Sequence, residues 1–228
     1  MSWHTILLWV LILGLSILFL AFYHATHPSK TTTHSITTDA VFFAIIFIMG
    51  FIPQMGYIAI VPGVSLTLMH LPILLGAYLF GWKRGLLYGI AFGVTSWLQA
   101  MMSGTGFNAF FIYPWISILP RALWGFLAGL FFQLLRKLPK IYGNAAVIAA
   151  GGLLLTVLHT GLVFGALFLF FPKVMVPMFT SSEPAGAGIA FTFLACILLG
   201  MAGESALGAI VTPALGLSVR KISERTKH

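Results

Sequence analysis

Long apolar segments alternate along this chain with short polar stretches. One apolar run covers residues 3–23, and six more follow from residue 39 onward. A bilayer core about 30 Å thick needs roughly 20 apolar residues in a helix, so these segments predict membrane spans. The pattern predicts an all-α polytopic membrane protein with a six-helix core and one extra N-terminal transmembrane helix. The core helices are expected at residues 39–53, 64–80, 85–102, from about 115 to the basic pair 136–137, 144–171 and 186–219.

The N-terminal segment is interpreted as a retained helix rather than a cleaved signal peptide. It has no basic region before it, its apolar run is long, and no clear small-residue cleavage site follows. The linker at residues 24–38 is rich in Thr and Ser and holds three histidines, His24, His27 and His34. Metal binding is one interpretation of that spacing, but a loop without Cys or carboxylate favours a solvated linker. The domain boundaries are therefore 1–38 for the extra helix and linker, 39–221 for the core and 222–228 for a basic tail, with Asp39 as the expected N-cap of the first core helix.

Composition supports a membrane protein, because 60% of residues are hydrophobic, 7% are charged and the mean hydropathy is +1.04. The net charge of +8 would suggest a nucleic-acid partner in a soluble protein. Here ten basic residues fall on one side of the predicted membrane, while Lys173 alone falls on the other. This asymmetry predicts that both ends of the six-helix core lie in the cytoplasm, and no nucleic-acid partner is expected. The ten residues are Lys30, Lys83, Arg84, Arg136, Lys137, Lys140, Arg220, Lys221, Arg225 and Lys227.

Small residues recur every four positions across the second and third core segments. This spacing is that of one helix face and predicts that the face is tightly packed. The residues are Ala77, Gly81, Gly85, Gly89 and Gly93, with Gly125 and Gly129 as a second pair on the fourth core helix.

A full charge, Arg121, lies inside the apolar run of the fourth core helix, directly after Pro120. If that helix starts near Trp115, Arg121 lies roughly 9 Å along its axis, at 1.5 Å per residue. A cation at that depth costs several kcal/mol unless it contacts protein, water or an anion. Two interpretations remain open: Arg121 holds a structural network together, or it binds a ligand with a negative group.

Polar and aromatic residues gather at the predicted outer ends of the core helices. Aromatic walls with a few convergent polar groups are typical of a small-molecule site. The alternative is an interfacial aromatic belt, which would not require a buried guanidinium. Candidate binding residues are Arg121, Tyr57, Gln54, His70, Trp97, Gln99, Asn108, Tyr113 and Trp115. His70 and His159 also fit neutral core histidines, and Glu204 fits a helix-packing or partner-interface carboxylate.

Catalytic signatures are absent from the sequence. There is no Walker A sequence, HExxH, CxxC or GxSxG motif, and the four acidic residues are too few for a paired-carboxylate site. We therefore expect no enzyme activity, no metal site and no cofactor in this chain. The lack of an inverted repeat or a run of intramembrane acids also counts against an ordinary secondary transporter.

The run PGVSLTLMHLPILLGAYLFGWKRGLLYGIAFGVTSWLQA, followed by FFIYPWISILPRALWGFLAGL, resembles the substrate-binding S components of energy-coupling factor (ECF) vitamin transporters. The AxxxA motif of that family fits Ala40 to Ala44, and its SxLPR element fits Ser117 to Arg121. The resemblance implies six helices and docking through Ala40 and Ala44 onto a transmembrane T component. It also implies partnership with two ABC ATPases that bind ATP and Mg²⁺, in the cell membrane.

The resemblance lies within the folate, riboflavin and pantothenate group of S components, and the His-Leu-Pro run at His70 looks most like the pantothenate type. Pantothenate offers a carboxylate for Arg121, with hydroxyl and amide groups for Gln99, Asn108 or Tyr57. Folate, cobalamin and pyridoxine remain alternatives, as does a polytopic scaffold that transports nothing.

Overall fold

The computed structural model describes residues 33–52, 55–61, 64–103, 106–138, 142–180 and 184–225. The chain divides into two units, Met1–Val41 and Phe42–His228, and the candidate site is built within the second. The predicted N-terminal helix, the three linker histidine side chains and Gln54 lie outside what the structure describes.

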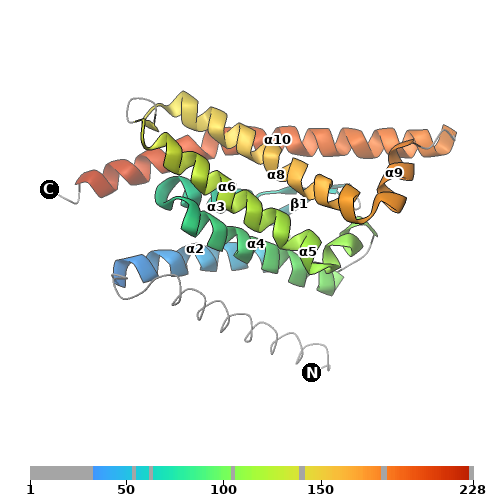
Figure 1. The fold of residues 1–228 in the computed structure, drawn as a ribbon, viewed down its shortest axis with the longest axis horizontal. Coiled ribbons are helices and arrows are strands. Elements are labelled where there is room, and N and C mark those ends of the chain that lie inside the picture. The colour runs from blue at the N-terminus through green and yellow to red at the C-terminus, as the bar shows by residue number, and fades with distance from the viewer. Residues whose placement is uncertain are drawn as a thin grey trace, which may run out of the picture. The chain divides into compact units, whose positions relative to one another are not determined.

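Helices dominate the described residues, as the sequence predicted. Four of them are long and apolar enough to cross a membrane, at 82–102, 114–135, 145–170 and 194–222, and two shorter apolar helices cover 35–51 and 70–80. The chain is therefore a multi-pass membrane protein. Figure 1 shows the elements α2 (Thr33–Phe51), α3 (His70–Phe80), α4 (Trp82–Ser103), the 3-10 helix η1 (Gly106–Ile112), α5 (Pro114–Ser117), α6 (Leu119–Leu135), α8 (Ala145–Phe170), α9 (Pro172–Thr180) and α10 (Pro184–Arg225).

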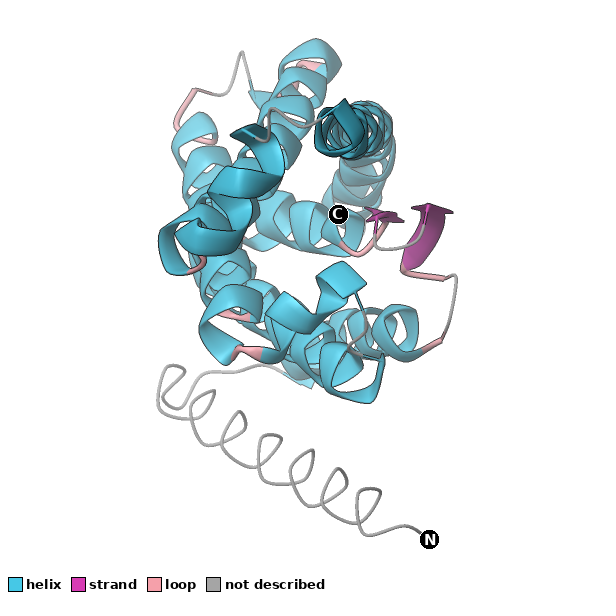
Figure 2. Cartoon of the chain, turned by 90° about the vertical axis from the view of Figure 1, so that its right-hand side faces the viewer, coloured by secondary structure: helices cyan, strands magenta, loops and turns pink. Residues whose placement is uncertain are grey.

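A β-hairpin replaces the first part of the predicted second core helix. Strands β1 (Tyr57–Val61) and β2 (Val64–Thr67) pair antiparallel, with Tyr57 opposite Thr67. Figure 2 shows the two strands in magenta beside the helices. The prediction of a helix from residue 64 was wrong, because short apolar runs rich in β-branched residues suit a strand as well as a helix. The helix of this segment begins only at His70.

One further boundary prediction was wrong. Asp39 is not an N-cap, because α2 already begins at Thr33. Pro72 is compatible with α3, because it lies in the first turn, where the missing N–H has no helical partner in any case. In contrast, Asn144 caps α8 near the predicted start, and its side-chain oxygen accepts the Ala146 N–H at 2.9 Å.

Helices α4 and α6 run antiparallel at very close range, and they meet on the small-residue faces that the sequence predicted to be tightly packed. A Cβ added at Gly85 would lie 2.3 Å from the Gly125 carbonyl oxygen, and one at Gly93 would lie 2.5 Å from the Ile118 Cα. A Cβ at Gly89 would lie 2.4 Å from the backbone oxygen of Arg121. Only glycine fits at these crossings, so the interface fixes where the first turn of α6 lies.

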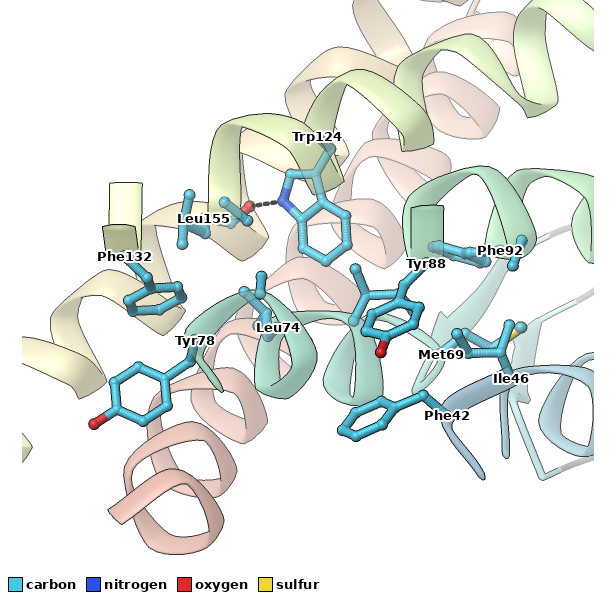
Figure 3. Packing of buried hydrophobic residues seen from close by; sticks show 14 of the residues in the cluster. Phe42, Ile46, Met69, Leu74, Tyr78, Tyr88, Phe92, Trp124, Phe132 and Leu155 are labelled. Carbon is cyan, nitrogen blue, oxygen red and sulfur yellow. Dashed lines mark hydrogen bonds between the residues drawn. The ribbon is translucent and has the colours of Figure 1, made fainter. Parts of the chain in front are cut away.

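Aromatic and aliphatic residues, most of them from α2, α3, α4, α6 and α8, form the core. Phe42 stacks on Tyr88, with ring centroids 5.0 Å apart. The Trp124 indole N–H donates to the Leu155 carbonyl at 2.6 Å and so ties α6 to α8 (Figure 3). The packing therefore holds α6 rigidly against both α4 and α8.

Candidate functional site

Arg121 lies buried in the first turn of α6. Proline has no N–H, so Pro120 leaves the Ile116 carbonyl of the preceding turn without its helical donor. The Arg121 Nη1 group supplies donors at this break, 2.8 Å from the Ser117 carbonyl oxygen and 3.4 Å from that of Ile116. The Pro-Arg pair thus stands at the break between α5 and α6. This structural role accounts for the Nη1 group of the buried guanidinium.

The other edge of the Arg121 guanidinium makes no hydrogen bond with the part of the chain that the structure describes. Its Nε is buried and has no hydrogen-bond partner, and Nη2 makes no hydrogen bond with any residue that the structure describes. The flat faces rest against Phe92 and Phe111, with Cζ 4.9 Å and 5.1 Å from the two ring centroids. An edge of two parallel N–H groups is the geometry that binds a carboxylate in bidentate fashion. Leaving it empty costs about 1–3 kcal/mol per buried group.

Tyr57, at the start of β1, brings a second polar group toward Arg121. The Tyr57 hydroxyl is buried without a hydrogen-bond partner among the described residues. It interacts electrostatically with Arg121 and Ser96, although the Ser96 hydroxyl does not meet hydrogen-bond geometry. Burial raises the pKa of the Tyr57 hydroxyl, against the opposing effect of the Arg121 charge. The hydroxyl is therefore a proton donor at neutral pH.

His70 and Glu204 join the hairpin to α10. The carboxylate of Glu204, buried on α10, accepts the Thr67 backbone N–H at 2.5 Å. His70 Nδ1 donates to the Thr67 carbonyl at 2.6 Å, and its Nε2 lies 3.2 Å from the Glu204 carbonyl oxygen. Both ring nitrogens of His70 therefore face protein acceptors. Glu204 also interacts electrostatically with Arg121, so this junction belongs to the same polar cluster.

His159 on α8 is the group that sequence reasoning gave little functional weight. Its imidazole lies between Phe92 and Trp124, with centroid distances of 5.5 Å and 4.9 Å. The side chain is 5% exposed, and neither ring nitrogen has a hydrogen-bond partner in the described part of the chain. It interacts electrostatically with Arg121 and His70. The sequence did signal His159, as an ionisable residue inside an apolar helix. Its neighbours could not be predicted, because they come from segments distant in the sequence.

The remaining predicted residues lie toward η1 and α5. Trp97 donates its indole N–H to the Ile112 carbonyl at 2.7 Å and so ties α4 to η1. Tyr113 and Trp115 are 41% and 44% exposed and contact each other, with centroids 5.1 Å apart. Asn108 is exposed on η1, and Gln99 is half-buried on α4. These residues form a more open region than the buried cluster around Arg121.

The cluster contains several ionisable side chains but not a metal site. Among the residues that the structure describes, no three His, Cys, Asp or Glu side chains are close enough to hold a metal ion. The chemistry of the cluster suits an organic anion, because a guanidinium edge, a phenol hydroxyl and an imidazole lie among aromatic rings.

Comparison with known proteins identifies the family. The family described as "ECF transporter, substrate-specific component" matches residues 34–216, most of the chain. The pantothenic acid transporter PanT of Lactococcus lactis is 26% identical over 199 residues, which cover 81% of this chain and 97% of that protein. The pantothenate transporter PanT of Leuconostoc mesenteroides is 29% identical over 109 residues, covering 46% of this chain and 53% of that protein. The chain therefore belongs to the substrate-specific (S) components of ECF transporters.

Proposed function

We propose that this chain captures pantothenate from outside the cell and delivers it inward together with an ATP-driven ECF module. The single observation that carries the proposal is the Nε edge of Arg121, which is buried and has no hydrogen-bond partner among the described residues. That edge suits one carboxylate, and the unpartnered Tyr57 hydroxyl beside it suits a neutral polar group. Pantothenate carries one carboxylate together with amide and hydroxyl groups.

The relatives favour the same ligand, because both matched proteins are named as pantothenate transporters. An ammonium or quaternary-amine ligand is disfavoured, since it would place a second cation beside Arg121 without a matching acceptor edge. Folate also carries carboxylates, while cobalamin and pyridoxine lack a free one. These three vitamins are the competitors that a binding screen must include.

Delivery is proposed to depend on partners, a T component and two ABC ATPases that bind ATP and Mg²⁺. Ala40 and Ala44 lie one turn apart on α2, and both are exposed. Small exposed residues at this spacing allow another helix to approach closely. With the basic residues on the cytoplasmic side of the cell membrane, the core termini lie inside and Arg121 lies in the outer half of its helix.

The ligand is tested by a thermal-shift screen of the detergent-purified chain against the water-soluble vitamins. A vitamin present at a hundred times its Kd should stabilise the fold by about 2.7 kcal/mol. Stabilisation by pantothenate alone supports the proposal, and calorimetry then gives its affinity. Stabilisation by another vitamin with no response to pantothenate rejects it.

The docking surface is tested separately with Ala44→Trp. The bulky ring should block a close helix approach and lower pantothenate uptake in cells that contain the ECF module, while pantothenate affinity stays unchanged. Leu158→Trp, at an exposed position of α8, is the control. Uptake that survives Ala44→Trp would place docking elsewhere.

A further inference from the structure

His159 is a further buried group near Arg121 whose ring nitrogens make no hydrogen bond with the residues that the structure describes. Both of its ring nitrogens are without partners among the described residues, although the side chain is almost fully enclosed. A core histidine normally bonds through at least one nitrogen, because each unpaired buried polar group costs about 1–3 kcal/mol. His70, in the same cluster, follows that rule, with both nitrogens opposite backbone carbonyls. His159 therefore lacks the features of a structural histidine.

The surroundings of His159 define what it can bind. Phe92 contacts both the Arg121 guanidinium and the His159 ring, so the two polar side chains lie on a shared aromatic wall. Trp124 covers the imidazole from α6, and the Trp124 N–H is already donated to Leu155. The neighbours thus fix the ring without using its nitrogens. A neutral imidazole has one N–H donor and one acceptor nitrogen, on opposite sides of the ring.

We propose that His159 is a specificity-determining contact residue: its two nitrogens bind the hydroxyl-bearing end of the ligand whose carboxylate Arg121 holds. One nitrogen donates to a ligand oxygen, and the other accepts a ligand O–H. This inference rests on the proposed function, since it divides one ligand between two recognition groups. Arg121 binds the ligand carboxylate, and His159 binds the ligand hydroxyl groups.

The division predicts a selective response to ligand analogues. Two are needed, both measured by calorimetry on the full-length chain in detergent: N-(3,3-dimethylbutanoyl)-β-alanine, which is pantothenate without its two hydroxyls, and pantothenamide, in which the carboxylate is an amide. The unmodified protein should bind pantothenate about tenfold more tightly than the dideoxy analogue, as expected for a lost hydrogen bond at a buried site.

The variant that isolates the imidazole is His159→Phe, which keeps an aromatic ring between Phe92 and Trp124 but removes both nitrogens. We expect it to bind pantothenate and the dideoxy analogue within about twofold of each other, while its preference for pantothenate over pantothenamide persists. His159→Gln retains a donor and an acceptor and should keep part of the hydroxyl preference. Leu158→Phe, the neighbouring exposed position, should leave both preferences unchanged.

The outcomes separate this inference from the proposed function. If the unmodified protein does not bind pantothenate, both fall. If it binds pantothenate but His159→Phe keeps the full preference for the hydroxylated ligand, the role of His159 alone is wrong. A purely structural role would weaken pantothenate and its dideoxy analogue equally and leave their ratio unchanged. His159→Gln decides the same point if His159→Phe does not fold.

Discussion

The α4–α6 interface and the polar cluster meet at Arg121, whose backbone belongs to the interface and whose side chain belongs to the cluster. The two regions differ in how completely their groups are packed and hydrogen-bonded. At the interface the backbones approach so closely that Gly89 has no room for a Cβ beside the Arg121 backbone oxygen. In the cluster, the buried Arg121 Nε, the Tyr57 hydroxyl and both His159 ring nitrogens have no hydrogen-bond partner among the residues that the structure describes. Close packing thus fixes the backbone of a residue whose side chain is left incompletely bonded. The difference is what a binding site needs: rigid support and polar groups that a ligand can complete.

Gly89→Val should disrupt the α4–α6 interface, and we expect it to have the largest effect of the substitutions considered. The new side chain would collide with the backbone of α6, which cannot rotate away, so we expect a loss of about 3 kcal/mol in the free energy of unfolding. Thermal unfolding in detergent should show a fall of roughly 10 °C in Tm. Gly165→Val on α8 is the matched control, because nothing lies within 4 Å of a Cβ at that position. Equal effects at both glycines would mean that close packing is not what Gly89 provides.

Arg121→Ala removes the guanidinium from the polar cluster. Pantothenate affinity should fall by about 2 kcal/mol or more, close to 30-fold, because a desolvated ligand carboxylate loses its partner. Arg121→Lys keeps the charge but not the two parallel N–H groups, so it should recover only part of that loss. Calorimetric titration checks both variants. Undiminished pantothenate binding by Arg121→Ala would leave the guanidinium with its helix-break role alone.

Tyr57→Phe separates binding from stability at a single atom. The hydroxyl has no hydrogen-bond partner among the described residues, so removing it should leave Tm unchanged or slightly higher. Pantothenate affinity should fall by about 1 kcal/mol, close to fivefold. Since the raised pKa keeps the hydroxyl protonated, this loss should be the same from pH 6 to pH 9. A marked drop in Tm would show that the hydroxyl supports the fold instead.

The smallest effect is expected from the same substitution at an exposed position, Tyr113→Phe. The Tyr113 ring already contacts Trp115 and Phe171, and its hydroxyl group remains near solvent. Deleting that hydroxyl should change pantothenate affinity by less than twofold, because water replaces it at little cost. A loss as large as that of Tyr57→Phe would extend the site to the more open region near η1.

Features governed by local periodicity were predictable from the sequence. The four-residue spacing of Gly85, Gly89 and Gly93 specifies a helix face whatever the rest of the chain does, and the structure confirms that this face is tightly packed. The apolar helices follow from the same kind of pattern. Arg121 could be singled out because a lone charge in an apolar run is conspicuous.

The hairpin and the partners of Arg121 depend on less local information. The run from Tyr57 to Thr67 is mostly apolar, and only the Pro62-Gly63 pair between its β-branched halves favours a turn. His159 and Glu204 stand 38 and 83 positions after Arg121 in the sequence, and no motif spacing links them. Tertiary packing of α8 and α10 brings them to the cluster.

Helix α10 has a consequence for the lipid around the protein. It is 42 residues long, and its apolar part runs over residues 194–219, ahead of Arg220 and Lys221, with Glu204 inside it. At 1.5 Å per residue this part measures about 39 Å, which is longer than a hydrocarbon core about 30 Å thick. A helix with such hydrophobic mismatch tilts or thickens the bilayer around it. Because Glu204 accepts the Thr67 N–H of the hairpin, we expect a tilt of α10 to displace the hairpin as well, so that acyl-chain length would influence the proposed ligand binding.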